Sequence, residues 1–258
     1  MKIIVLVKDV PDTYVDRNLS LETGLVDREN SENILDEICE RAVEVALKAS
    51  DNLDDVEVVA LTLGRENAVE TLRKALAMGA DSGVHIEDDQ LHGADLTLTA
   101  EAIAKAISKT GYDLVIAGNY STDGSGGVLP AMIAEALGVP LASSLASVDI
   151  GTDKLSGTRP NADGVATVST SLPAVISITE ANPDGRFPNF KGIMAAKKKP
   201  VETYSLEDLE VNADPSQAPR SIMVSVAQRP PREAGTKIVD EGDAGTQLAD
   251  FLVSNRLV

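Results

Sequence analysis

The first 140 residues repeat one pattern four times: a short apolar run is followed by a stretch whose apolar residues have helical spacing. The runs predict strands at Ile3–Val7, Val56–Leu63, Gly83–Ile86 and Leu114–Ala117, and the stretches predict helices at Glu37–Ala49, Ala68–Met78, Leu96–Ile107 and Val128–Leu137. Continuous apolar runs are typical of strands covered on both faces, and helical crossovers join parallel strands. The repeat therefore predicts an α/β fold built on a doubly wound, mostly parallel sheet.

The pattern changes after Pro140. Short segments at Ala146–Ile150, Lys154–Thr158, Ala166–Ser171 and Ala174–Ile178 are expected to form antiparallel hairpins that extend the sheet. A long loop without regular structure is expected over 182–199. From residue 201 to 258 the chain is polar and contains Pro215 and Pro219, which predicts an extended arm with a short helix near Thr246–Val253. We expect a domain over 1–200 and an arm over 201–258 that packs on another chain.

Composition excludes several classes of partner. The formal charge of the 258 residues is −18, so the basic footprint that nucleic acid requires is missing overall. Strong acidity also disfavours anionic membranes, and no apolar run approaches the roughly 20 residues of a spanning helix. One cysteine, Cys39, rules out an internal disulfide. These features predict a cytoplasmic protein without membrane insertion.

The turn Gly118–Gly127 is the main candidate for a binding site. It reads Gly-Asn-Tyr-Ser-Thr-Asp-Gly-Ser-Gly-Gly and lies between a buried strand and a helix, where α/β sheets bind ligands. Glycines allow close approach to a phosphate, and the helix adds free amide donors. An ordinary flexible loop is the alternative. The Walker sequence is absent and no lysine in the turn would meet a terminal phosphate, which favours holding a nucleotide over hydrolysing it.

Groups for catalysis are few. His85 alternates with apolar residues in an expected strand, and His92 lies in an acidic loop, so both are interpreted as structural or solvated. Cys39 is interpreted as a small buried residue, because no nearby histidine would activate it. No Cys/His cluster suggests a metal site.

A second candidate surface lies in the expected loop. The apolar residues Phe187, Phe190, Ile193 and Met194 precede the lysines 197–199. They could pack into the core and leave the lysines solvated, or they could form an apolar anchor with a basic rim for another protein. Two of the three phenylalanines of the chain lie here, which favours docking.

Together these segments resemble the β subunit of electron transfer flavoprotein over nearly the whole chain. The resemblance rests on the order and spacing of six segments: Val7-Lys8, Cys39–Glu44, Ala75–Asp81, Gly118–Gly127, Leu172–Val175 and Ile193–Pro200. It implies an adenine nucleotide α-hydrolase-like fold and a non-enzymatic electron carrier.

In that family a heterodimer forms with an α subunit that carries most of the FAD site, while the β subunit binds AMP or, in bifurcating members, a second FAD. The FAD takes electrons from flavin dehydrogenases, such as the acyl-CoA dehydrogenases of fatty acid oxidation, and passes them to a quinone reductase or another acceptor. The alternatives are a stand-alone nucleotide-binding protein of the universal-stress type, which needs neither docking loop nor arm, and a nucleotide hydrolase or ligase. A hydrolase or ligase would need a phosphate-binding lysine or a Ser-Gly-Gly-x-Asp-Ser loop, and the sequence has neither.

The resemblance also assigns roles to individual residues. Its nucleotide contacts correspond to Leu6, Asp36, Glu37, Ile38, Cys39, Leu63, Gly118, Asn119, Tyr120, Ser121, Thr122, Asp123, Gly124, Ser125, Gly126, Gly127, Val128 and Leu129. Its flavin-facing residues correspond to Tyr14 and Ile38. Its dehydrogenase-docking residues correspond to Arg186, Phe187, Phe190, Ile193, Met194, Lys197, Lys198 and Lys199. The stretch after Asp123 departs from the family's usual Asp-x-x-x-Gly-Gln, which leaves the identity of the nucleotide open, and Phe190 replaces the usual leucine anchor.

Overall fold

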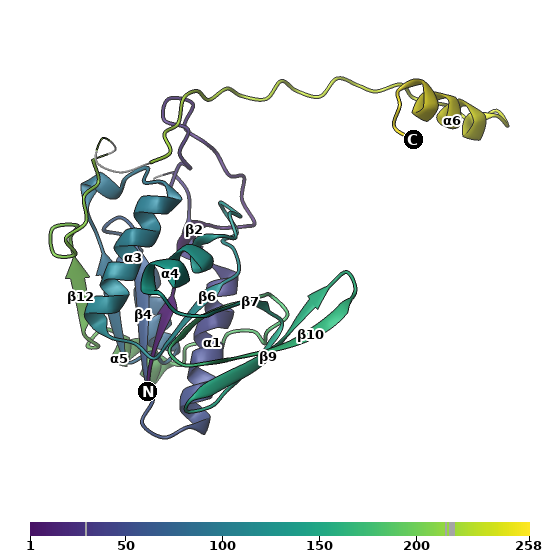
Figure 1. Ribbon diagram of the computed structural model, residues 1–258. Helices are drawn as coiled ribbons and strands as arrows, with labels where there is room; N and C mark the ends of the chain where they lie inside the picture. Colours follow the sequence, from purple (N-terminus) through teal and green to yellow (C-terminus); the bar gives the residue numbers. More distant parts are fainter. Residues whose placement is uncertain (29, 215, 217–219) are drawn as a thin grey trace. The chain divides into compact units, whose positions relative to one another are not determined.

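A parallel seven-stranded sheet forms the centre of the computed structural model, which describes residues 1–28, 30–214, 216 and 220–258 (Figure 1). Its order is β12-β5-β4-β1-β6-β11-β7. The strands span Lys2–Leu6 (β1), Glu57–Leu63 (β4), Ser82–Ile86 (β5), Leu114–Gly118 (β6), Leu141–Leu145 (β7), Ala174–Ile178 (β11) and Val201–Tyr204 (β12). Because β1 lies inside the sheet with β4 and β5 on one side and β6 on the other, the chain winds in both directions. The predicted doubly wound α/β fold is confirmed.

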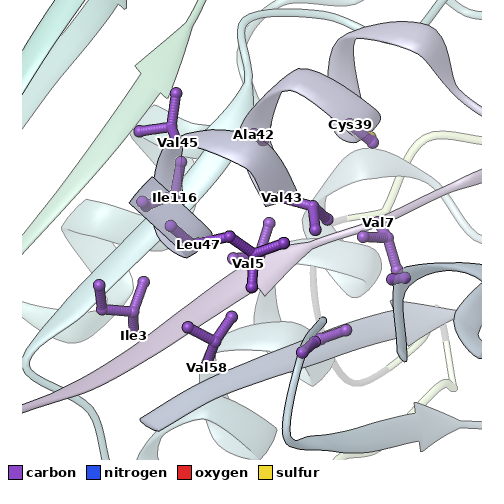
Figure 2. Close-up of a cluster of buried hydrophobic side chains, with 14 of the residues drawn as sticks. Ile3, Val5, Val7, Cys39, Ala42, Val43, Val45, Leu47, Val58 and Ile116 are labelled. Atoms are coloured by element: carbon purple, nitrogen blue, oxygen red, sulfur yellow. The ribbon is translucent and has the colours of Figure 1, made fainter. Parts of the chain in front are cut away.

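Helices cover both faces of this sheet. Helices α1 (Glu37–Asn52) and α2 (Ala68–Met78) pack on one face, and α3 (Leu96–Thr110) and α4 (Leu129–Leu137) pack on the other. Successive side chains of β1 point to opposite faces of the sheet and so belong to two separate cores: Ile3 and Val5 face α1, whereas Ile4 faces α3 and α4. Figure 2 shows the α1 side of this core. Each fully buried side chain of this size contributes about 1.5–3 kcal/mol to folding, so the two cores fix the sheet firmly.

The region after α4 differs from the prediction. The segment Ala174–Ile178 is not part of a hairpin: it is β11, a fully buried parallel strand between β6 and β7. Strand β7 was not predicted, because two serines interrupt the apolar residues of its sequence Leu-Ala-Ser-Ser-Leu and none of its residues is β-branched. The antiparallel extension is a separate three-stranded sheet of β8 (Ser147–Ile150), β9 (Lys154–Asn161) and β10 (Gly164–Ser171).

The compact part of the chain continues past the expected boundary at residue 200. Strand β12 joins the edge of the central sheet beside β5, and Leu206, Leu209 and Val211 enter the α3–α4 core. The compact unit therefore spans Met1–Val224, and a second unit spans Ser225–Val258. The second unit contains α6 (Ala244–Ser254), close to the predicted helix. Pro215 and Pro219 lie outside the described residues.

Shorter elements complete the first unit. Strands β2 (Asp9–Pro11) and β3 (Asn33–Leu35) pair at the two ends of the polar stretch after β1, and a 3-10 turn, η1, spans Asp89–Leu91. Helix α5 (Phe190–Ala196) forms where an irregular loop was expected. No described helix has the length and apolar character needed to cross a bilayer.

Candidate functional site

The predicted nucleotide-binding residues gather at the edge of the sheet that is formed by the carboxyl ends of its strands. Strands β4, β1 and β6 are neighbours in the order β4-β1-β6, so the carboxyl ends that carry Leu63, Leu6 and Gly118 lie together. The winding direction reverses between β1 and β6, and such a switch point is where open α/β sheets bind ligands. The first turn of α1, with Glu37, Ile38 and Cys39, and the Gly118–Gly127 turn adjoin this edge.

Asp36 connects α1 to the glycine-rich turn. One carboxylate oxygen caps the helix by accepting from the Ile38 amide at 2.9 Å. The other accepts from the amide and the hydroxyl of Thr122, at 2.7 and 2.9 Å. Close packing adds to this connection, since a Cβ on Gly118 would lie 2.9 Å from the Ile38 side chain. The start of α1 and the turn therefore form one rigid structure.

Asp123 is the second residue that holds the turn in place. Its side chain is only 2% exposed, and it accepts from the Lys8 ammonium at 2.8 Å and from the Arg28 guanidinium. Burial by itself raises the pKa of Asp123. The Lys8 cation and hydrogen bonds from Lys8, Arg28 and Ser121 outweigh that effect and hold the pKa far below its usual value. Lys8 and Arg28 are thus both paired with Asp123 within the protein.

The sequence did not predict that cationic side chains from the N-terminal stretch bind the glycine-rich turn. Arg28 also donates to the Asp9 carbonyl at 2.9 Å, and Arg17 donates to the Thr122 carbonyl. Neither arginine lies in a periodic segment, so the sequence offered no signal for its position. Lys8 lies in one of the segments that carry the family resemblance, but the resemblance assigns it no role. These side chains fasten the turn to the N-terminal stretch.

The remaining part of the turn has the properties of a phosphate site. Residues 124–128 are exposed, and Val128, the N-cap residue of α4, provides no side-chain cap. In the described part of the chain, the amides of Gly126, Gly127 and Val128 donate no hydrogen bond. The buried Oδ1 of Asn119 also has no hydrogen-bond partner among the described residues. Open amides at a helix start, where the dipole is positive, suit a phosphate group. The residues present therefore fit a nucleotide.

The other residues assigned by resemblance have different exposures. Leu6, Ile38 and Cys39 are buried, Leu63 and Leu129 are half-buried, and Tyr120 and Val128 are partly exposed, so their contact with a nucleotide stays a prediction. Tyr14 is 92% exposed in the polar stretch after β2. Contact between Tyr14 and a flavin stays a prediction.

Cys39, His85 and His92 are the side chains that were considered for reactivity. Cys39 is buried, as predicted, and burial, followed by the charge of Asp36, raises the pKa of its thiol. His85 is buried with its Nε2 3.1 Å from the Gly64 carbonyl, and His92 contacts Arg65. Among the described residues, no three or more His, Cys, Asp or Glu side chains form a group that could hold a metal.

The second predicted surface, residues 186–199, is named here the docking segment. Phe187 and Phe190 are 96% and 78% exposed, and Ile193 and Met194 are about half exposed. The alternative in which these side chains pack into the core is therefore wrong. Lys197 and Lys198 are exposed, but Arg186 and Lys199 are bound to groups of their own chain. A cavity of about 660 Å³ lies between α2 and the segment.

Comparison with known proteins gives a consistent result. Residues 23–209 match the family model described as electron transfer flavoprotein domain. The chain is 45% identical to the electron transfer flavoprotein subunit beta of Mycobacterium leprae (strain TN), over 99% of each chain. It is 33% identical to the subunit of the same name from Syntrophomonas wolfei, over 98% of this chain and 96% of the relative. It is 31% identical to the caffeyl-CoA reductase-Etf complex subunit CarD of Acetobacterium woodii, over 98% and 97%.

Proposed function

This chain belongs to the electron transfer flavoprotein family, as a relative of its β subunits, and from that premise we propose that it binds AMP and completes the FAD site of an α subunit. The heterodimer carries electrons and is not itself an enzyme. Its FAD, held mainly by the α subunit, accepts electrons from flavin dehydrogenases and passes them to a quinone reductase or another acceptor.

The observation that carries the nucleotide proposal is the state of the Gly118–Gly127 turn. Its two acidic anchors, Asp36 and Asp123, are fully engaged within the protein, while the amides of Gly126, Gly127 and Val128 remain open. Lys8 and Arg28 both form ion pairs with Asp123, so a long polyphosphate would have to compete with that carboxylate for either cation. A single phosphate at the start of α4, as in AMP, needs only the amides and the helix dipole. The nucleotide is therefore proposed to be structural.

The docking segment supports the electron-transfer role. Four large apolar side chains are exposed beside the lysines at 197 and 198, and an exposed apolar cluster with a polar rim is typical of protein interaction sites. The name of one relative associates it with a caffeyl-CoA reductase complex, and we extend this to propose that the partners of this chain are acyl-CoA dehydrogenases. A stand-alone sensor would need no docking segment. The similarity to β subunits covers 99% of the chain, which favours the β-subunit function over the sensor.

The second unit is proposed to pack on the α subunit. By itself α6 buries none of its residues, although Leu248, Phe251 and Val253 are apolar. Apolar residues along an unsupported helix are stabilised by burial against another surface. A cytoplasmic location is proposed as well, because a reduced, buried Cys39 fits a reducing compartment.

The decisive experiment identifies the bound nucleotides. The chain is co-expressed with its α subunit, the heterodimer is purified and denatured, and the released nucleotides are quantified by mass spectrometry and by flavin absorbance. We expect one AMP and one FAD per heterodimer. Two FAD would mean that this chain holds a flavin instead of AMP. A colourless heterodimer, or a lone chain saturated with flavin, would contradict the proposed function.

A further inference from the structure

We propose that Arg73 and Lys199 fix the docking segment to α2, Arg73 by capping the end of α5 and Lys199 by capping the end of α2, so that both are positioning residues and neither contacts the partner. Arg186 anchors the other end of the segment in the same way. The inference rests on the proposed function, because it explains how a segment assumed to dock dehydrogenases is held in its docking shape.

Lys199 caps α2. Its ammonium donates to the carbonyls of Leu76, Gly79 and Ala80, at 3.0, 3.2 and 2.5 Å. Leu76 lies in the last turn of α2, Gly79 is its C-cap and Ala80 follows, and α2 has no basic residue in its own last turn. A helix leaves its last carbonyls without partners inside the helix, and its end has a partial negative charge. All three donors of the ammonium are therefore used within the chain.

Arg73, which lies on α2, caps the end of α5. Its guanidinium donates to the carbonyls of Ala196 and Lys199, both at 2.7 Å, and Ala196 is the last residue of α5. The backbones of the two helices also meet closely, since a Cβ on Gly192 would lie 2.4 Å from the Ala77 carbonyl oxygen. The end of α5 thus receives a cation from α2, and the end of α2 receives one from the chain that follows α5.

Arg186 holds the beginning of the docking segment on α1. Its Nε donates to the Glu44 carboxylate at 2.8 Å, and its NH2 donates to Glu44 and Asp51 at 3.2 and 2.8 Å. Glu44 is itself buried, so it provides a fixed partner. The Asn189 side chain then caps the start of α5 by accepting from the Gly192 amide at 2.9 Å.

The anchors separate the segment into two sets of side chains. Arg186 and Lys199 face the protein, whereas Phe187, Phe190, Ile193 and Met194, with the exposed lysines 191, 197 and 198, face outward. A helix of seven residues is not stable alone in water, so without anchors the segment would have to order during each encounter. Anchoring it beforehand removes that entropic cost and favours a partner with an apolar pocket bordered by carboxylates.

The anchoring is tested by amide hydrogen exchange on the heterodimer, which requires no dehydrogenase. Lys199→Met and Arg73→Met are each expected to accelerate exchange across α5 by about tenfold or more, because Arg73→Met uncaps α5 and Lys199→Met releases the chain after α5 from α2. Lys199→Arg keeps a donor and is expected to restore part of the protection. Lys197→Met, a neighbouring exposed lysine, is the matched control and is expected to leave α5 exchange unchanged. Unchanged exchange in both Met variants would overturn the proposal.

The positioning role is tested with the heterodimer as electron acceptor of a short-chain acyl-CoA dehydrogenase reduced by butyryl-CoA. Lys199→Met is expected to raise the KM for the heterodimer about tenfold with kcat and the flavin spectrum unchanged. Phe190→Ala is measured in parallel. If Phe190→Ala raises the KM and Lys199→Met does not, the positioning role is overturned. If neither variant has an effect, the docking function itself fails, while the exchange data still decide the anchoring.

Discussion

The buried carboxylate of Asp36 accepts two hydrogen bonds from Thr122, one from the amide at 2.7 Å and one from the hydroxyl at 2.9 Å. These residues are 86 positions apart, yet one oxygen joins the start of α1 to the glycine-rich turn. The same side chain caps α1 through its other oxygen. Asp36 therefore couples helix stability to the shape of the proposed nucleotide site.

Replacement of Asp36 by Ala is expected to affect both properties. The substitution removes a helix cap and leaves the Thr122 amide unpaired, so we expect the free energy of unfolding to fall by about 2–4 kcal/mol. Urea unfolding of the heterodimer and the AMP content after dialysis measure the two effects. Asp88→Ala is the control, because Asp88 caps a different turn through the Gln90 amide. It is expected to cost about 1 kcal/mol and to leave AMP bound.

Replacement of Asp123 by Asn is expected to reveal a specific acid dependence. The pKa of Asp123 lies below its usual value of 3.8, so its ionised form stabilises the fold. That contribution is complete above about pH 5 and is lost as the pH falls through the lowered pKa. The stability difference between wild type and variant is therefore expected to be largest near neutral pH and to shrink below about pH 4.

Urea midpoints at a series of pH values measure this difference. Asp149→Asn, at an exposed position of β8, is the comparison and should change stability by no more than about 0.5 kcal/mol throughout. A difference for Asp123→Asn that stays constant down to the lowest pH would exclude the proposed charge network.

Replacement of Gly192 by Ala is expected to displace α5. The added Cβ would lie 2.4 Å from a backbone oxygen of α2, which cannot move away as a flexible side chain can. We expect a loss of about 1–3 kcal/mol and weaker docking to the dehydrogenase. Gly235→Ala, where a Cβ meets nothing within 4 Å, is the matched control. Thermal unfolding and the KM for the heterodimer give the two results.

The thiol of Cys39 is expected to be unreactive in the folded protein. It is buried and its pKa is raised, so little thiolate forms and little reagent reaches it. Reaction with a disulfide reagent near pH 8 is expected to be at least about a hundredfold slower than in guanidinium chloride. Rapid labelling of the native heterodimer would show that the first turn of α1 opens readily.

The fold could be predicted from the sequence where burial imposes a regular pattern. The first four strand-helix units have apolar runs and helical spacing, and the structure has elements close to those positions. Strand β7 escaped prediction because Ser143 and Ser144 interrupt its apolar character. Strand β11 was predicted as a strand, but its parallel pairing depends on β6 and β7, which are distant in sequence.

The site could be predicted only in part for a similar reason. The Gly118–Gly127 turn has a local signature, since glycines follow a buried strand. The anchoring side chains Lys8, Arg28 and Arg73 have none, because each acts on a segment more than 90 residues away. Lysines 197–199 look alike in sequence, yet Lys199 differs from its neighbours through contacts with the end of α2.

The placement of the docking segment between β11 and β12 limits how its specificity can evolve. Four strands separate β11 from β12 in the sheet, so the connecting chain bridges roughly 24 Å while remaining fastened to α1 and α2. Insertions or deletions within this bridge would shift its anchors or pull β12 from the edge of the sheet. New partners are therefore expected to be acquired through substitutions at outward positions such as Phe190, with the length of the bridge unchanged.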